Sequence, residues 1–229
     1  MRLDRLLVEK GLVQSREKAQ ALIMAGSILV DGQQVLKPGV EAGLDSQITI
    51  KETRPFVSRA GVKLASALDY TGLDVTGLAV MDVGSSTGGF TDCLLKRGAR
   101  MVYAIDVGKG LLDISLRNDG RVKVIEGRNI RYLDLDEVGE KVDLAVIDVS
   151  FISLEKVIPK VRGFLKEGEK VLALIKPQFE ADKGNVGKGG IVRDPLEHSA
   201  VVERIKGFCK GIGLKPVSTF ESAIKGIKG

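Results

Sequence analysis

The sequence predicts an α/β protein in which a small α+β module precedes a larger domain built on an open, mostly parallel sheet. Apolar runs of five to seven residues alternate with helical stretches between residues 79 and 176, and a glycine-rich turn follows the first run. The 229 residues suit a small domain followed by a medium one. Hydrophobic residues make up 44% of the chain, which is enough for a packed core.

The N-terminal module is expected to hold two helices and a small sheet. Apolar residues at helical spacing follow Arg2 until Gly11, and a second helix begins after Ser15 and ends at Gly26. A hairpin is predicted over 28–36 because Asp31 and Gly32 form a favoured two-residue turn, and 48–50 is a further strand. The module therefore covers residues 1–53. A linker over 54–57 contains Pro55, and the second domain covers 58–229.

The second domain is predicted to contain a series of parallel strands joined by helices. The expected strands are residues 79–83, 101–106, 122–126, 142–148, 171–176 and 215–224. A helix over 58–64 precedes the first strand, and another over 90–97 follows the glycine-rich turn.

The turn after the first strand is a candidate ligand loop, because glycines let the backbone approach a ligand and the next helix offers free N–H groups. It consists of Gly84, Ser85, Ser86, Thr87, Gly88 and Gly89. A dinucleotide fingerprint would require Gly where Ser86 stands, so that match is poor. Asp82, just before the turn, is instead typical of methyltransferases. Asp106, at the end of the second strand, can accept hydrogen bonds from two ribose hydroxyls, and Asn129 is placed near an adenine.

Three charged residues are candidates for chemistry. Asp148 and Lys176 end neighbouring strands, where an open α/β sheet has its crevice, and Lys63 comes from the helix before the first strand. Burying an ammonium group is costly without a carboxylate partner, and Asp148 is the obvious partner of Lys176. The competing interpretation is that these are three unrelated surface charges.

Net charge and cysteine content indicate the kind of partner and the cellular compartment. The net charge of +5 favours an anionic partner, although residues 1–53 hold seven basic and seven acidic residues and are neutral. The two cysteines form no disulfide framework, which indicates a reducing cytoplasm. The single His198 without a Cys/His cluster predicts no metal site, and the short apolar runs predict no membrane span.

The first module resembles the RNA-binding domain named after ribosomal protein S4. The matching positions include Arg2-Leu3-Asp4, Ser15-Arg16, Leu22-Ile23 and Val30-Asp31-Gly32. The resemblance implies binding of structured RNA. Its candidate contacts to RNA are Arg2, Arg5, Arg16 and Lys18, with Arg59 added from the start of the second domain. The alternative is that each of these side chains is an ordinary exposed residue.

The whole chain is similar to the TlyA family, whose second domain is a Rossmann-like class I methyltransferase of the FtsJ type. The resemblance is carried by Lys63, Asp148 and Lys176 and by residues 148–153, 176–180 and 187–195. It implies S-adenosylmethionine as cofactor, ribosomal RNA or ribosomal subunits as partner, and methylation of cytidine at the ribose 2′-hydroxyl. Because that hydroxyl must lose its proton, Lys176 is expected to orient and activate it. Asp148 would hold Lys176, and Lys63 would support both.

The family pattern also implies a seventh strand and a final catalytic Glu beyond Gly229, so the chain is expected to be C-terminally incomplete and to have reduced or no catalysis. Two other functions remain open. The chain could be a non-catalytic RNA-binding protein with a methyltransferase fold. It could also be a haemolysin, the name that older family members carry.

Overall fold

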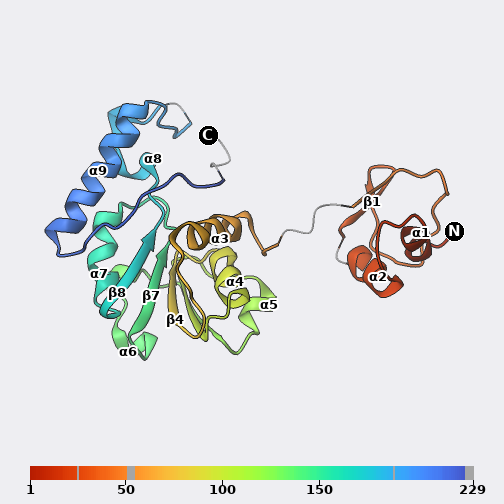
Figure 1. The fold of residues 1–229 in the computed structure, drawn as a ribbon, viewed down its shortest axis with the longest axis horizontal. Helices are drawn as coiled ribbons and strands as arrows, with labels where there is room; N and C mark the ends of the chain where they lie inside the picture. Colours follow the sequence, from red (N-terminus) through yellow and green to blue (C-terminus); the bar gives the residue numbers. More distant parts are fainter. Residues whose placement is uncertain (25, 51–54, 188, 225–229) are drawn as a thin grey trace. The chain divides into compact units, whose positions relative to one another are not determined.

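The computed structural model describes residues 1–24, 26–50, 55–187 and 189–224, and the chain separates into the compact units Met1–Arg54 and Pro55–Gly229 (Figure 1). Of the four residues expected to form the linker, Arg54 lies outside the described residues. Residues 55–57 pack on the second unit, where the backbone N–H of Val57 donates to the Asp92 carboxylate at 2.8 Å and Lys96 donates to the carbonyl of Pro55 at 2.8 Å.

The N-terminal unit has the expected two helices and three-stranded sheet. Its elements are α1 (Leu3–Glu9), α2 (Arg16–Met24), β1 (Ile28–Val30), β2 (Gln33–Gln34) and β3 (Ile48–Ile50). Strand β1 lies between β2 and β3 and pairs antiparallel with both. Ser15 caps α2, because its Oγ accepts from the N–H of Lys18 at 3.2 Å. Asp31 and Gly32 take positive φ values of 50° and 79°, as a tight hairpin turn requires.

The second unit is built on a five-stranded, all-parallel sheet. Its strands are β4 (Ala79–Val83), β5 (Met101–Asp106), β6 (Val122–Glu126), β7 (Val142–Ile147) and β8 (Leu165–Ala173). They lie in the order β6-β5-β4-β7-β8. The chain starts in the middle of the sheet, so the strand order reverses beside β4 and leaves a crevice at the carboxyl ends there.

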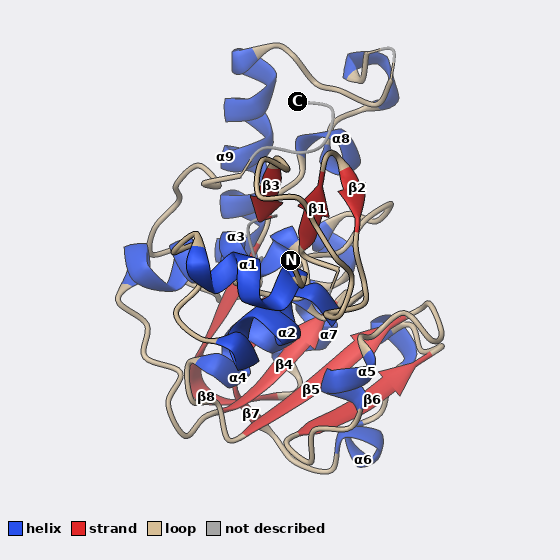
Figure 2. Cartoon of the chain, turned by 90° about the vertical axis from the view of Figure 1, so that its right-hand side faces the viewer, coloured by secondary structure: helices blue, strands red, loops and turns tan. Residues whose placement is uncertain are grey.

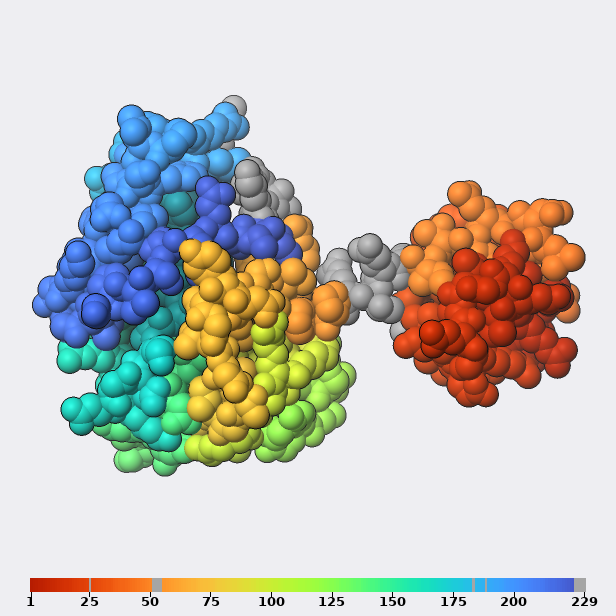
Figure 3. All heavy atoms as spheres, in the orientation of Figure 1, coloured from red at the N-terminus to blue at the C-terminus, as the bar shows by residue number. Residues whose placement is uncertain are grey.

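Helices cover both faces of this sheet, as Figure 2 shows. One face carries α3 (Arg59–Thr71), α4 (Gly89–Lys96) and α5 (Ile114–Arg117), and the other carries α6 (Leu135–Val138), α7 (Ile158–Arg162) and α9 (Pro195–Gly211). Alternate residues of β4 serve the two cores: Val80 packs with α3 and α4, and Met81 packs with α7. Short connecting helices are η1 (Ile130–Tyr132), η2 (Leu154–Lys156), α8 (Pro177–Glu180) and η3 (Lys183–Asn185). Figure 3 shows the packed atoms of each unit.

Two strand predictions were wrong. The strand expected over 171–176 ends at Ala173, and Lys176 is the residue that precedes α8. Pro177 explains this, because proline has no N–H for a strand ladder and suits the first turn of a helix. The strand expected over 215–224 is not present, although these residues are described. Val217, Thr219 and Phe220 are residue types common in strands, but a strand also needs a hydrogen-bonded neighbour, and no described segment pairs with residues 215–224.

Candidate active site

A pocket of about 390 Å³ lies at the carboxyl ends of β4, β7 and β8, where the strand order reverses. It brings together the start of α3, the loop after β4, the residue after β7 and the residue before α8. Its lining consists of Ser58, Ala60, Lys63, Gly84, Ser85, Ser86, Thr87, Phe90, Asp148, Ser150 and Lys176. The three charged residues that the sequence singled out therefore share one pocket with the first four residues of the glycine-rich loop.

Lys176 and Asp148 form a close ion pair in this pocket. The Nζ atom of Lys176 lies 2.6 Å from Oδ1 of Asp148, and the two side chains are only 17% and 13% exposed. Lys176 also donates to Oγ of Ser150 at 3.0 Å. Because burial weakens solvent screening, the carboxylate holds the ammonium group in one place more firmly than a surface pair would.

Lys63 also lines this pocket. It lies on α3 and is half-buried, and the ion pairs recorded for the described residues do not include it. Arg59, one helical turn earlier, is exposed. The structure thus brings Lys63 to the pocket without joining it to Asp148.

The loop after β4 is held in a strained shape. The N–H groups of Gly84 and Ser85 both donate to the carbonyl of Ile105, at 2.9 and 3.1 Å. Gly84 has a φ of 88°, and a Cβ atom there would lie 2.7 Å from the carbonyl oxygen of Asp148. Ser86, which stands where a dinucleotide fingerprint has Gly, keeps a φ of 48°. A left-handed non-glycine residue costs free energy and is most often found at functional sites.

Gly88 and Gly89 do not line the pocket. Both lie where neighbouring residues leave no room for a Cβ atom. A Cβ on Gly88 would lie 2.3 Å from a methyl group of Leu116. On Gly89 it would lie 2.2 Å from Oγ of Ser58 and 2.9 Å from the N atom of Gly61. These glycines let α4 begin against α3 and α5, and this contact sets the position of the loop.

Asp82 lies in the interior of β4, directly before the loop. Its Oδ2 accepts from the hydroxyl of Thr91 at 2.7 Å, and Oδ1 is buried without a hydrogen-bond partner among the described residues. Burial raises the pKa of Asp82 to about 7, and the nearby charges of Asp148 and Asp106 add to the effect. The carboxyl group is therefore poised to change its protonation state near neutral pH.

Asp106 is tied to the loop at the end of β5. Its two oxygens accept from the backbone N–H groups of Ser86 and Gly108, at 2.8 and 2.7 Å. Each carboxylate oxygen has a second lone pair, so these contacts leave acceptor capacity for a ligand hydroxyl. Asn129 follows β6, and its side chain accepts from the N–H of Arg131 at 3.1 Å. Neither Asp106 nor Asn129 lines the pocket itself.

Several residues of this region were missed from the sequence. Phe151 is 91% exposed with a φ of 63°, and its ring lies 4.9 Å from that of Phe179. Glu180 is buried, and its Oε1 accepts from the N–H of Leu154 at 2.8 Å. Arg204 of α9 contacts the same residue, with 3.7 Å between Nη2 and Oε2. Glu180 therefore joins the segment after Lys176 to the segment after Asp148. One feature of the sequence could have pointed to Glu180: it is an acidic residue only four positions after the candidate Lys176.

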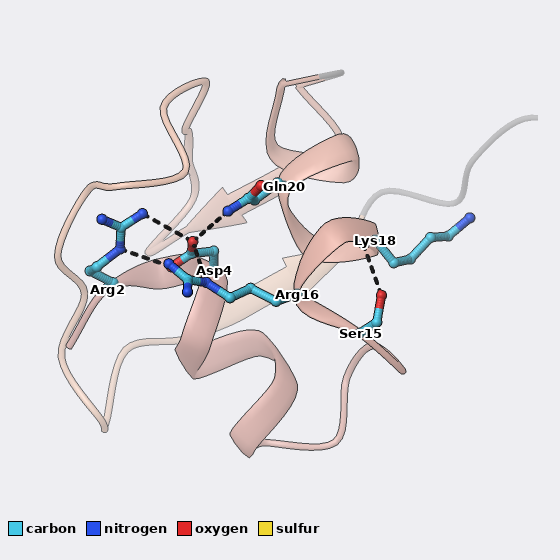
Figure 4. Close-up of polar contacts among 6 residues, drawn as sticks. All are labelled: Arg2, Asp4, Ser15, Arg16, Lys18 and Gln20. Carbon is cyan, nitrogen blue, oxygen red and sulfur yellow. Dashed lines mark hydrogen bonds and ion pairs between the residues drawn. The ribbon is translucent and has the colours of Figure 1, made fainter.

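The candidate RNA contacts of the N-terminal unit have different surroundings. Arg2 and Arg16 both bind the carboxylate of Asp4, together with Gln20, whereas Lys18 points away from this cluster (Figure 4). Arg5 is exposed on α1. The clustering of the two arginines was not predicted. Its signal is Asp4 itself, an acidic residue in the apolar face of α1 between Leu3 and Leu7.

Comparison with known proteins agrees with this division of the chain. Residues 56–229 match the family model described as FtsJ-like methyltransferase, and residues 1–48 match the S4 domain. The chain is 41% identical over 230 residues to the Mycobacterium tuberculosis protein named 16S/23S rRNA (cytidine-2′-O)-methyltransferase TlyA, covering 100% of this chain and 86% of that protein. It is 40% identical to Hemolysin A of Brachyspira hyodysenteriae, covering 100% and 96%.

A solved structure is also similar. A Streptococcus thermophilus protein that carries the name hemolysin has a TM-score of 0.69 at 39% identity, covering 93% of this chain and 78% of that one. The fold and the comparisons define the class: a Rossmann-like methyltransferase preceded by an S4 domain. Within this class, the chain belongs to the TlyA family of FtsJ-like methyltransferases.

The pocket has features that fit S-adenosylmethionine, the cofactor of this class. Ser85 Oγ, in the pocket lining, and Asp82 Oδ1, two residues before Gly84 and outside the lining, are buried oxygens without a partner among the described residues, and both can accept from an ammonium group. Gly84 adjoins them, where a Cβ would collide with the backbone after β7. Among the described residues, no group of three His, Cys, Asp or Glu side chains is arranged as metal ligands.

Proposed function

We propose that this chain methylates the 2′-hydroxyl of cytidine ribose in ribosomal RNA, with S-adenosylmethionine as methyl donor. The observation that carries the proposal is the Lys176–Asp148 ion pair beside the loop after β4 in one pocket. The relatives named as rRNA (cytidine-2′-O)-methyltransferases support the substrate. A ribosomal RNA substrate also indicates that the protein works in the cytoplasm.

Transfer of a methyl group to a ribose hydroxyl is favoured by a cation close to the hydroxyl oxygen. A ribose hydroxyl is a weak nucleophile and gives its proton to solvent water as it attacks the methyl carbon, so negative charge develops on its oxygen. The ammonium group of Lys176, held by Asp148 at 2.6 Å and by Ser150 at 3.0 Å, is placed to orient the hydroxyl and stabilise that charge. Lys63 adds a second positive charge to the same pocket.

The cofactor, when bound, supplies the methyl group and the sulfonium leaving group. The residues that would hold it are Gly84–Thr87, where glycine lets the backbone approach a ligand closely, Ser85 and Asp82 through the unpaired oxygens, and Asp106 through its remaining acceptor capacity. Asn129 is proposed at the adenine end. Gly88 and Gly89 would act indirectly by fixing the loop.

The test is to map ribose methylation on ribosomal RNA treated with the chain and S-adenosylmethionine. We expect new 2′-O-methylcytidine with the unchanged chain and none with Lys176→Ala. Failure to bind S-adenosylmethionine, even with RNA present, would favour the non-catalytic RNA-binding alternative.

Hemolysin A and the Streptococcus thermophilus protein are among the similar proteins that carry the name hemolysin, so membrane lysis needs its own test. No helix within the described part of the chain is long and apolar enough to cross a membrane. Release of calcein from liposomes treated with the chain would support lysis. We expect no release at concentrations that methylate RNA.

A further inference from the structure

The N-terminal unit contains a buried charge that the proposed reaction does not explain. The side chain of Asp4 is 0% exposed, although it lies on a helix of only seven residues at the surface of a small domain. A buried carboxylate is costly unless it is paired and hydrogen-bonded. Asp4 therefore needs partners, and the structure supplies three of them.

The three partners come from both sides of the α1–α2 contact, as Figure 4 shows. Arg2 binds the carboxylate with two parallel hydrogen bonds of 3.1 Å, from Nε to Oδ1 and from Nη2 to Oδ2. Arg16 donates from Nε to Oδ2 at 2.9 Å, and Gln20 donates from Nε2 to Oδ2 at 2.9 Å. Arg16 and Gln20 are one helical turn apart on α2, so they approach Asp4 from the same face.

The arginines remain open to solvent although their carboxylate is not. Their side chains are 45% and 42% exposed. A guanidinium group has five N–H donors, of which Arg2 uses two and Arg16 one on Asp4. Within the described part of the chain, no other acceptor is recorded for them. The cluster thus presents two cations with unused donors and a net charge of about +1 at the surface.

The backbone around Arg2 is also fixed. Arg2 forms a β-bridge with Glu41, and the N–H of Leu3 donates to the carbonyl of Val40 at 2.8 Å. Both ends of the Arg2 side chain are therefore restrained, at its backbone and at its guanidinium. A long cationic side chain normally loses rotamer freedom when it binds a ligand, and a side chain held beforehand loses less.

We propose that Asp4 is a positioning residue, which holds Arg2 and Arg16 in place as one preorganised site for a phosphodiester group of the RNA. The proposal rests on the proposed function, because it assigns a role in recognition of the RNA substrate. Gln20 is part of the same cluster, since it donates a hydrogen bond to the Asp4 carboxylate without adding charge. The two arginines bind the phosphate, and Asp4 acts only through them.

The proposal makes a prediction opposite in sign to simple electrostatics. Asp4→Asn removes a negative charge beside two phosphate-binding cations, so the change in charge alone would strengthen RNA binding. On our proposal the affinity falls, because the asparagine amide has no charge to hold the two cations and replaces one acceptor oxygen with an NH2 group that faces a guanidinium donor. We expect RNA affinity about 5- to 20-fold weaker, from two side chains that must now be ordered on binding.

The experiment measures binding of the full chain to purified ribosomal subunits over a series of KCl concentrations. Glu9→Gln is the matched control, because it makes the same charge change at an exposed position on the same helix. We expect Glu9→Gln to bind as tightly as the unchanged chain or slightly tighter. For Asp4→Asn we expect weaker binding and a salt slope reduced by about one phosphate contact.

Further readouts separate positioning from general damage. At saturating RNA, Asp4→Asn should keep the methylation kcat and raise only the KM for RNA. If Asp4→Asn does not fold, Gln20→Met replaces it, because this change removes one donor to the carboxylate and leaves every charge in place. We expect about 2- to 3-fold weaker RNA binding for Gln20→Met.

The possible outcomes are distinguishable. If the unchanged chain binds subunits while Asp4→Asn, or Gln20→Met in its place, binds equally well or tighter, the positioning role is wrong and the proposed function stands. If the unchanged chain does not bind ribosomal subunits at all, the proposed function fails and this inference fails with it.

Discussion

Asp4 in the N-terminal unit and Asp82 in the methyltransferase unit are both removed from solvent, yet their pKa values move in opposite directions. Hydrogen bonds from Arg2 hold the pKa of Asp4 well below its usual range, with Gln20 and Arg16 adding to the effect. Burial raises the pKa of Asp82 to about 7, because its recorded partner is the neutral hydroxyl of Thr91 and its charged neighbours are acidic. Burial alone therefore does not decide the charge of a carboxylate, and the partners do.

The two units also place their paired charges in different surroundings. In the N-terminal unit the buried carboxylate is surrounded by cations that face solvent, which suits binding of a large anion. In the second unit the cation Lys176 and its partner Asp148 line a pocket, which suits chemistry on one group. The first arrangement should determine affinity and the second should determine rate.

The largest effect is expected for Lys176→Ala. Loss of the ammonium group should lower kcat for RNA methylation about 10²- to 10⁴-fold, because the developing oxyanion loses its cation. RNA affinity should remain within about 2-fold, since binding energy comes mainly from many phosphate contacts. Transfer of labelled methyl groups and subunit binding measure the two quantities. Lys156→Met, at an exposed lysine of η2, is the control. A large loss of affinity without loss of kcat would contradict the division of roles between the units.

The next effect is the pH dependence of stability from Asp82. Its folded pKa of about 7 lies above the unfolded value of about 3.9, so the folded state favours the protonated group. The stability contribution is then present below about pH 4 and lost as the pH rises to about 7. Asp82→Asn should become more stable relative to the unchanged chain over this range, by a few kcal/mol at about pH 7.5.

Urea unfolding at several pH values, followed by a probe of the second unit, checks the Asp82 prediction. A constant difference between Asp82→Asn and the unchanged chain from pH 4.5 to 8 would show that burial does not control this group. The N-terminal unit supplies the internal comparison. Asp4 has a depressed pKa, so its contribution should persist through this range and be lost only in strong acid.

A smaller effect on the free energy of unfolding distinguishes a glycine needed for close packing from a glycine needed for its left-handed backbone. At Gly89 a Cβ would meet Ser58 Oγ at 2.2 Å and the Gly61 N atom at 2.9 Å, so Gly89→Ala should cost about 1–3 kcal/mol of unfolding free energy. At Gly11 nothing lies within 4 Å, but φ is 66°. Gly11→Ala should therefore cost only about 1 kcal/mol, from the left-handed backbone. Chemical denaturation of each unit measures both costs. Equal costs would mean that the α3–α4 contact relaxes easily.

The smallest effect is expected for Arg5→Ala. Arg5 is exposed on α1 and lies outside the Asp4 cluster, so its loss should weaken RNA binding only about 2-fold. The same change at Arg16 should weaken binding more, because Arg16 is held in place by Asp4. Binding to ribosomal subunits at a single salt concentration compares the two variants. A larger effect at Arg5 would show that preorganisation contributes little here.

The parts of the fold with strong local patterns could be predicted from the sequence. Residues 79–83, 101–106 and 122–126 were expected as strands and are β4, β5 and β6 with those bounds. Strands β4 and β5 are central, bury both faces and so read as nearly continuous apolar runs, whereas β6 is an edge strand that also contains Lys123 and Glu126. Residues 215–224 show where this reasoning fails, because pairing depends on a neighbouring strand, which the residue types of one segment cannot predict.

The candidate site was predictable for a related reason. Asp148 and Lys176 each follow an apolar run, and a parallel sheet brings the ends of neighbouring strands to one edge. Glu180 and Gln20 could not be assigned a role in the same way. Their partners lie 26 and 16 residues away in the chain, and only the packing of separate elements brings them together.

By itself, the sequence determined the class of fold, the glycine-rich loop and the three charges of the pocket, because each depends on local pattern and on parallel strands ending at one edge of the sheet. Only the tertiary structure decided that Lys176 meets Asp148 at 2.6 Å, that Gly88 and Gly89 serve packing, and that Asp4 gathers two arginines. The physical reason is that hydrogen bonds and pKa shifts depend on distances and burial, which are set when distant segments pack together.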